Sequence, residues 1–203
     1  MGTWRIAATA MVLFSVLSPG ALDARDGTDR RQLVVRTYDT FGVGAGERDV
    51  ATSTARQLLR SAEIDILWRN CTRPAADPAC ASSLAAGELS VRFVSTPSSD
   101  TSADLGRSLV DVVEKRGSLC TVFVDRVHQF AADAGIEPGV LLGRAMAHEL
   151  GHLLLGTNNH SRHGLMRPQW LLGELKRDVM TDWTLSRSEG EQMRRGLAPL
   201  DLS

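Results

Sequence analysis

The segment that most constrains this chain is an apolar stretch at residues 138–155, with the sequence PGVLLGRAMAHELGHLLL. Pro138 suits the first turn of a helix and Gly156 suits a C-terminal cap, so the stretch is predicted to form one helix of about five turns. Apolar side chains occupy most of its circumference, which is typical of a helix in the middle of a domain. The polar side chains on this helix therefore need compensation for the water that they lose.

Three polar residues of this helix point to a metal site. His148 and His152 are four residues apart, so both imidazoles project from one helical face and can bind the same ion. Glu149 is rotated by about 100° from His148 and can reach a water molecule at that ion without being a ligand. Burying these groups costs several kcal/mol unless a cation such as Zn²⁺ compensates their charge and polarity. The pattern predicts a zinc site, and a hydrogen-bonded histidine and glutamate network without metal is the alternative.

A catalytic zinc site needs a third protein ligand and keeps one position for water. His160 follows His152 by eight residues, and Gly156 allows the chain to fold back between them. His163 and Glu174 are further along the chain and have suitable ligand atoms. Reach and ligand type favour His160, with His163 and Glu174 as open alternatives.

These residues resemble a known family. The sequence HELGHLLLGTNNH at 148–160, followed by GLMRP at 164–168, is similar to the metzincin zinc endopeptidases, especially the matrixin-like members. In that family an HExxHxxGxxH pattern provides three histidine ligands and a catalytic glutamate, and a methionine in a tight turn lies beneath the metal. The present sequence departs from the pattern because its glycine stands four residues after the second histidine rather than three, and its third histidine stands eight residues after it rather than six.

The resemblance assigns a role to each matching residue. It implies that His148, His152 and His160 bind one catalytic Zn²⁺, that Glu149 is the general base, and that Met166 forms the floor of the site. The implied function is that of a secreted zinc-dependent endopeptidase, which hydrolyses peptide bonds of a protein or peptide substrate with a zinc-activated water. The alternatives are a zinc amidase acting on cell-wall peptides and a non-catalytic zincin-fold binding module. An intact glutamate beside the ligands argues against the binding module, because a structural metal site has no use for an adjacent base.

The rest of the chain predicts a mixed order of strands and helices. An amphipathic pattern favours a helix over 47–64, and residues 105–113 are compatible with either a strand or a helix. The strand predicted at 89–94 alternates with period two, which favours one face exposed to water. Further strands are predicted at 32–37, 64–68 and 119–124. Together with the resemblance, this order predicts an α+β, metzincin-like domain at 25–203, with a mostly parallel twisted sheet, a backing helix and a central active-site helix.

The first 24 residues have the features of a signal peptide. Arg5 supplies a positive charge, residues 6–17 form a short apolar run, and Ser18-Pro19-Gly20-Ala21 ends it with small residues suited to cleavage. The run is too short to span a bilayer comfortably, so no stable membrane anchor is expected after cleavage. We therefore expect export, to the periplasm or outside the cell.

Cysteine usage and net charge indicate the compartment and the class of partner. Cys71 and Cys80 flank a short proline-containing loop and are expected to form a disulfide in an oxidising compartment, whereas Cys120 lies in an apolar segment and is expected to be a buried thiol. The formal net charge of −1 gives no basic excess to neutralise a phosphate backbone, so nucleic-acid binding is excluded as a main role.

Overall fold

A computed structural model describes residues 31–74 and 76–197 of the chain. The signal peptide predicted at 1–24 lies outside these residues. Within the described ranges, no helix combines the length and the hydropathy that a membrane span requires.

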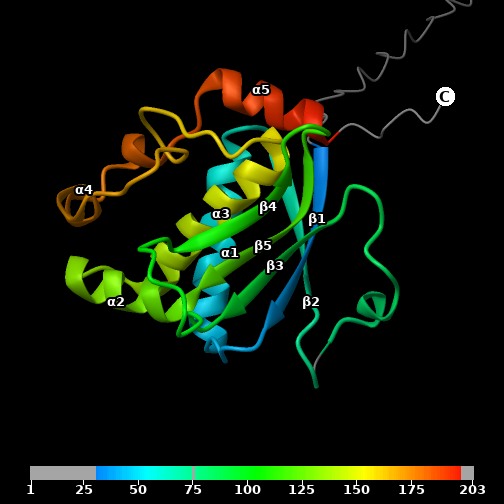
Figure 1. Cartoon of the computed structure of the whole chain (residues 1–203), viewed down its shortest axis with the longest axis horizontal. Coiled ribbons are helices and arrows are strands. Elements are labelled where there is room, and N and C mark those ends of the chain that lie inside the picture. The colour runs from blue at the N-terminus through cyan, green and yellow to red at the C-terminus, as the bar shows by residue number, and fades with distance from the viewer. Residues whose placement is uncertain (1–30, 75, 198–203) are drawn as a thin grey trace, which may run out of the picture.

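A five-stranded sheet forms the centre of the protein, with the strand order β2-β1-β3-β5-β4 (Figure 1). Four strands are parallel, and they are β1 (Arg31–Asp39), β2 (Ile64–Asn70), β3 (Leu89–Val94) and β5 (Arg116–Phe123). The fifth, β4 (Gly106–Asp111), runs antiparallel to β5 at one edge of the sheet. The prediction of a mostly parallel sheet is confirmed, and the ambiguous segment at 105–113 contains the edge strand.

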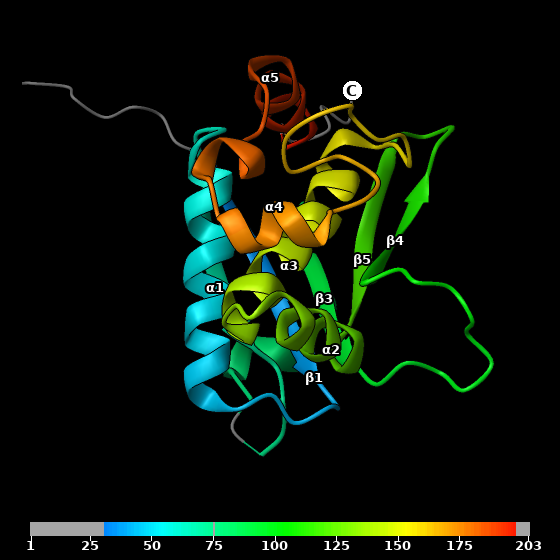
Figure 2. The same ribbon diagram turned by 90° about the vertical axis from the view of Figure 1, so that its left-hand side faces the viewer.

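The helices lie mainly on one side of this sheet, with α1 and α3 packed together and α2 and α4 in front of α3 in Figure 2. They are α1 (Ala45–Arg60), α2 (Val124–Ala134), α3 (Pro138–Leu155), α4 (Leu172–Arg177) and α5 (Arg187–Gly196), with 3₁₀ turns at Pro78–Ala81 and Met180–Trp183. The helix predicted at 138–155 has the predicted bounds. The helix predicted at 47–64 ends earlier, at Arg60, because the chain turns into β2 through Glu63 in the left-handed region, with φ of 59°.

Helix α3 is the central helix, and glycine allows α1 to approach it closely. A Cβ atom at Gly143 would lie 2.5 Å from the carbonyl oxygen of Ala51 and 2.6 Å from Cβ of Thr54. Gly139, one turn earlier, would similarly place a Cβ atom 2.8 Å from Cβ of Val50. The two glycines thus fix α3 against α1, while the other side of α3 contacts β4 and β5.

Strand β3 departs from the expected pattern of one wet face. Arg92 is exposed, but Ser90 on the same face is buried, and its hydroxyl donates to the carbonyl oxygen of Ser118 at 2.9 Å. A strand between β1 and β5 has neighbours on both sides, which shield the small serine while the longer arginine reaches water.

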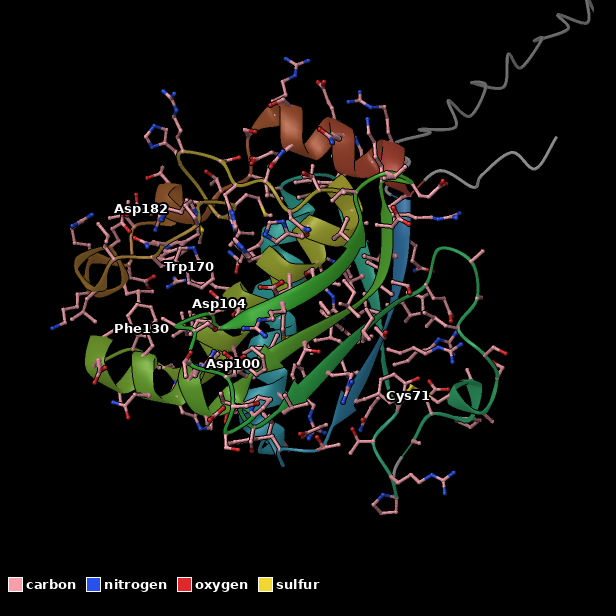
Figure 3. All side chains as sticks on the ribbon, viewed as in Figure 1. Cys71, Asp100, Asp104, Phe130, Trp170 and Asp182 are labelled. Atoms are coloured by element: carbon pink, nitrogen blue, oxygen red, sulfur yellow. A yellow bond between two sulfur atoms is a disulfide. The ribbon has the colours of Figure 1, made fainter. Side chains whose placement is uncertain are left out.

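The predicted disulfide between Cys71 and Cys80 is present, in the segment that follows β2 (Figure 3). Arg36 of β1 holds the end of the same segment through an ion pair with Glu88 at 2.5 Å and a hydrogen bond to the carbonyl oxygen of Ser82 at 2.7 Å. The thiol of Cys120 is fully buried, as expected, and burial raises its pKa well above the usual value.

The close contact between α1 and α3 generates a stability prediction. Gly143→Ala is expected to destabilise the protein by about 1–3 kcal/mol, because the added methyl group overpacks a backbone contact. Gly46→Ala is the matched control, since Gly46 also lies in a helix and a Cβ atom there has nothing within 4 Å. This control lies in the first turn of α1 and is expected to leave the free energy of unfolding nearly unchanged or slightly higher. Chemical denaturation measures both changes, and equal effects would contradict the packing argument.

Candidate metal centre

Three histidine side chains meet at the C-terminal half of α3. His148 and His152 lie one turn apart on the helix, and His160 comes from the loop that follows it. The ligand nitrogens of all three lie within 4.8 Å of one another. Nε2 of His148 and Nε2 of His152 are 3.1 Å apart.

Backbone carbonyl groups orient the two helical imidazoles. Nδ1 of His148 lies 2.9 Å from the carbonyl oxygen of Leu165, and Nδ1 of His152 lies 2.8 Å from that of Thr157. A carbonyl oxygen only accepts hydrogen bonds, so in both neutral rings Nδ1 carries the hydrogen and Nε2 presents a lone pair. Two lone pairs that face each other at this distance repel unless a cation lies between them. In metal sites of proteins, the histidine nitrogen that does not bind the metal typically donates its hydrogen to a carbonyl or carboxylate group in the same way.

The protonation of the cluster also fits a metal. The pKa of His148 is lowered to about 4, mainly by burial; the Leu165 carbonyl group opposes this shift, and the neighbouring imidazoles of His152 and His160 contribute to it. Burial likewise lowers the pKa of His152 and of His160. All three rings are therefore neutral at physiological pH, which is the form that binds metals. Adjacent nitrogens around a tetrahedral Zn²⁺ lie about 3.3 Å apart, so the 3.1 Å separation of the His148 and His152 nitrogens fits zinc.

Of the three candidates for the third ligand, the structure brings only His160 to the helical pair. His163 is exposed and stands outside the cluster. Glu174 caps the N-terminus of α4, where its Oε2 accepts a hydrogen bond from the backbone N–H of Leu171 at 2.9 Å. The same carboxylate forms an ion pair with Arg167 at 3.0 Å. Its Oε2 atom is thus engaged in holding the chain, and Glu174 is not part of the histidine cluster.

Glu149 lies beside the cluster with its carboxyl group buried under the edge strand. Its Oε2 is 2.6 Å from the hydroxyl oxygen of Ser108 on β4. The pKa of Glu149 is raised to about 7, mainly by burial; the hydrogen bond from Ser108 opposes this rise, and the negative charge of Asp104 contributes to it. A cation held by the histidines would favour the ionised carboxylate and lower this pKa.

Met166 packs against α3 at Gly151, the residue that precedes His152. A Cβ atom at Gly151 would lie 2.5 Å from Sδ of Met166, so the absence of a side chain there makes room for the sulfur. Met166 is fully buried, and the preceding residue, Leu165, supplies the carbonyl group that orients His148. The turn that contains this methionine therefore lies directly against the metal centre.

Aromatic side chains also pack against the histidine cluster, and the sequence did not indicate this contact. The rings of Trp170 and His148 form a T-shaped pair with centroids 5.6 Å apart, and Trp183 forms another with Trp170 at 5.4 Å. The guanidinium groups of Arg144 and Arg167 stack on Trp183, at 3.9 Å and 4.9 Å from its centroid. The tryptophans were visible in the sequence, but nothing local to them indicated a contact with a histidine.

The cluster opens into a cleft of about 840 Å³ that His148, Glu149, His152 and His160 all line. One wall consists of β4 and the loop before it, and the other of α2 and residues 167–171. In Figure 3, Asp104, Phe130 and Trp170 mark these walls on the side where α2 and α4 lie. Leu109 and Leu171 also line the cleft, and both are more than half exposed, at 66% and 60%. The metal centre is therefore accessible to a large ligand.

Neither a protein-family model nor a curated protein sequence matches the chain. The fold, however, is similar to that of a solved structure, archaemetzincin from Methanopyrus kandleri. The two superpose with a TM-score of 0.51 over 84% of this chain and 97% of that chain, at 16% sequence identity. This likeness confirms the α+β, metzincin-like fold. The finer resemblance to matrixin-like members stays a prediction.

The geometry predicts which histidines bind zinc. His148→Ala and His152→Ala are expected to reduce bound zinc from about one ion per chain to near zero, because each removes one of the two facing nitrogens. His160→Ala is expected to weaken binding so that zinc is lost on dialysis. His163→Ala is the matched control and should retain the ion. Elemental analysis after dialysis measures all four, and zinc loss from the His163 variant with retention in the His160 variant would contradict the assignment.

Proposed function

We propose that this protein is a zinc-dependent endopeptidase in which Glu149 is the general base. One observation carries the proposal. The facing Nε2 atoms of His148 and His152 and the carboxyl group of Glu149 line the same accessible cleft. A purely structural zinc site is closed by protein ligands, whereas a catalytic one keeps an open position with a base beside it. The metzincin-like fold supports the same conclusion.

His148, His152 and His160 would hold the zinc, because all three rings are neutral and their ligand nitrogens cluster. Backbone carbonyl groups orient the rings of His148 and His152 for that task. When bound, zinc supplies Lewis acidity that polarises a peptide carbonyl group and acidifies water. Glu149 accepts the proton of the attacking water on a carboxylate oxygen and transfers it to the nitrogen of the leaving amine. A C–O bond forms and the C–N bond breaks, so the carboxyl group ends the cycle ionised, as it began.

The walls of the cleft favour a polypeptide substrate. The cleft is open, runs between an edge strand and the segment before α4, and has exposed leucine side chains, Leu109 and Leu171, on its two walls. Exposed apolar side chains around a cleft are typical of a surface that binds another molecule. An extended peptide segment contacts both walls at once.

Export is part of the proposal and rests on residues 1–24, whose apolar run and small residues are typical of a signal peptide. The disulfide between Cys71 and Cys80 supports it, because such bonds persist in oxidising compartments.

The function is tested with the zinc-loaded mature protein and a fluorescently labelled, denatured protein as substrate. Glu149→Gln is expected to lower kcat by at least about 100-fold, because proton transfer by a positioned base contributes 10²–10⁴-fold. Bound zinc should stay at about one ion per chain. Glu114→Gln, which removes an exposed carboxylate on the β4–β5 hairpin, is the control and should retain full activity.

A chelator is expected to abolish cleavage by the wild-type protein, and added zinc to restore it. Undiminished cleavage by the Glu149 variant would show that another group is the base. Cleavage that persists after complete removal of metal would contradict zinc dependence.

A further inference from the structure

Two residues of the edge strand meet the carboxyl group of Glu149. Gly106 and Ser108 are two positions apart on β4, so both face the same side of the sheet, toward α3. Arg107 between them points away and is half exposed. On this face β4 has no side chain at Gly106 and a hydroxyl group at Ser108, and both positions adjoin Glu149, the candidate base.

Gly106 leaves the space that the side chain of Glu149 occupies. A Cβ atom at this position would lie 2.8 Å from both Cγ and Oε1 of Glu149, and 2.8 Å from the carbonyl oxygen of Thr121. Distances below 3.0 Å require something to shift, and the backbone of Thr121 is fixed in β5. An alanine at this position therefore forces both the Glu149 side chain and the β4 backbone at position 106 to shift.

Ser108 supplies the hydrogen bond. Its hydroxyl oxygen is 2.6 Å from Oε2 of Glu149 and 2.8 Å from the backbone carbonyl oxygen of the same residue. A hydroxyl group has one hydrogen, so it donates to one of these two oxygens at a time. Either hydrogen bond keeps the hydroxyl group of Ser108 in contact with Glu149. Among the described residues, no other side chain hydrogen-bonds this carboxyl group.

We infer that Ser108 is a positioning residue, which holds the carboxyl group of Glu149 in one rotamer within the space left by Gly106. This inference rests on the proposed function. A glutamate side chain has three rotatable bonds, and a buried one with no fixed partner would sample several orientations. A misplacement of about 1 Å costs about 100-fold in rate. The hydroxyl group therefore contributes to kcat rather than to substrate binding.

The first arm of the test measures the contact itself, in the metal-free protein and without any assay of activity. Ser108→Ala, Glu149→Ala and the double variant form a double-mutant cycle in thermal unfolding. The two changes in Tm are expected to be non-additive, because each single variant already removes the shared hydrogen bond. Additive changes would show that the two side chains do not interact, and would overturn the inference.

The second arm measures kinetics of the zinc-loaded protein. Ser108→Ala is expected to lower kcat about 10- to 100-fold with KM changed less than about twofold, and with zinc content unchanged. Ser108→Thr keeps the hydroxyl group and is expected to recover most of kcat. Equal losses in the alanine and threonine variants, or an unchanged kcat in the alanine variant, would overturn the positioning role.

Gly106→Ala is expected to lower kcat as well, by displacing the carboxyl group. Gly44→Ala is its control, because a Cβ atom there has nothing within 4 Å and Gly44 is remote in sequence from the site. If Gly106→Ala does not fold, the serine variants still decide the question. If wild-type protein cleaves no polypeptide, the proposed function fails together with the catalytic role of Ser108, whereas non-additive unfolding still establishes the contact.

Discussion

The structure of the site depends on two hydrogen bonds from imidazole to backbone. The carbonyl groups of Leu165 and Thr157 bind Nδ1 of His148 and of His152, and thereby turn both Nε2 lone pairs toward each other. Free rotation of either ring would remove this convergence. Both carbonyl groups come from segments that follow α3 in the chain, so the helix and the segments after it must fold together before the donor set exists. The centre is thus a tertiary feature, although its most visible motif is local.

The electrostatics of the metal-free site favour the neutral forms of its side chains. Burial favours neutral forms of the histidines and raises the pKa of Glu149 to about 7, so the metal-free site carries little net charge. A divalent cation reverses this preference for the glutamate, because opposite charge favours its ionised form. Binding of a divalent cation would therefore be coupled to ionisation of the Glu149 carboxyl group. The position of Glu149 beneath an edge strand keeps it buried enough for this coupling, while the cleft keeps it accessible.

Local patterns were sufficient to predict much of the fold. The bounds of α3 followed from its apolar circumference, Pro138 and Gly156, and the parallel strands from short apolar runs between turns. Strand β4 was ambiguous because its sequence, GRSLVD, is half exposed and has few apolar residues. The contact between Ser108 and Glu149 spans 41 residues of sequence and depends on the antiparallel addition of that strand. No local pattern contains that information, and the same holds for the contact of Trp170 with His148.

The spacing of the third histidine shows how a departure from a family pattern is accommodated. Two extra residues separate His152 from His160, and Thr157 organises the longer turn. Its N–H donates to the carbonyl oxygen of His152 at 3.3 Å, its carbonyl oxygen accepts from Nδ1 of the same residue, and its hydroxyl oxygen accepts from the N–H of Asn159 at 3.1 Å. Gly156 begins this turn with a φ of 64°, which few other residues adopt. The residue that orients the second imidazole therefore also directs the chain toward the third, so the longer spacing retains all three nitrogens in one cluster.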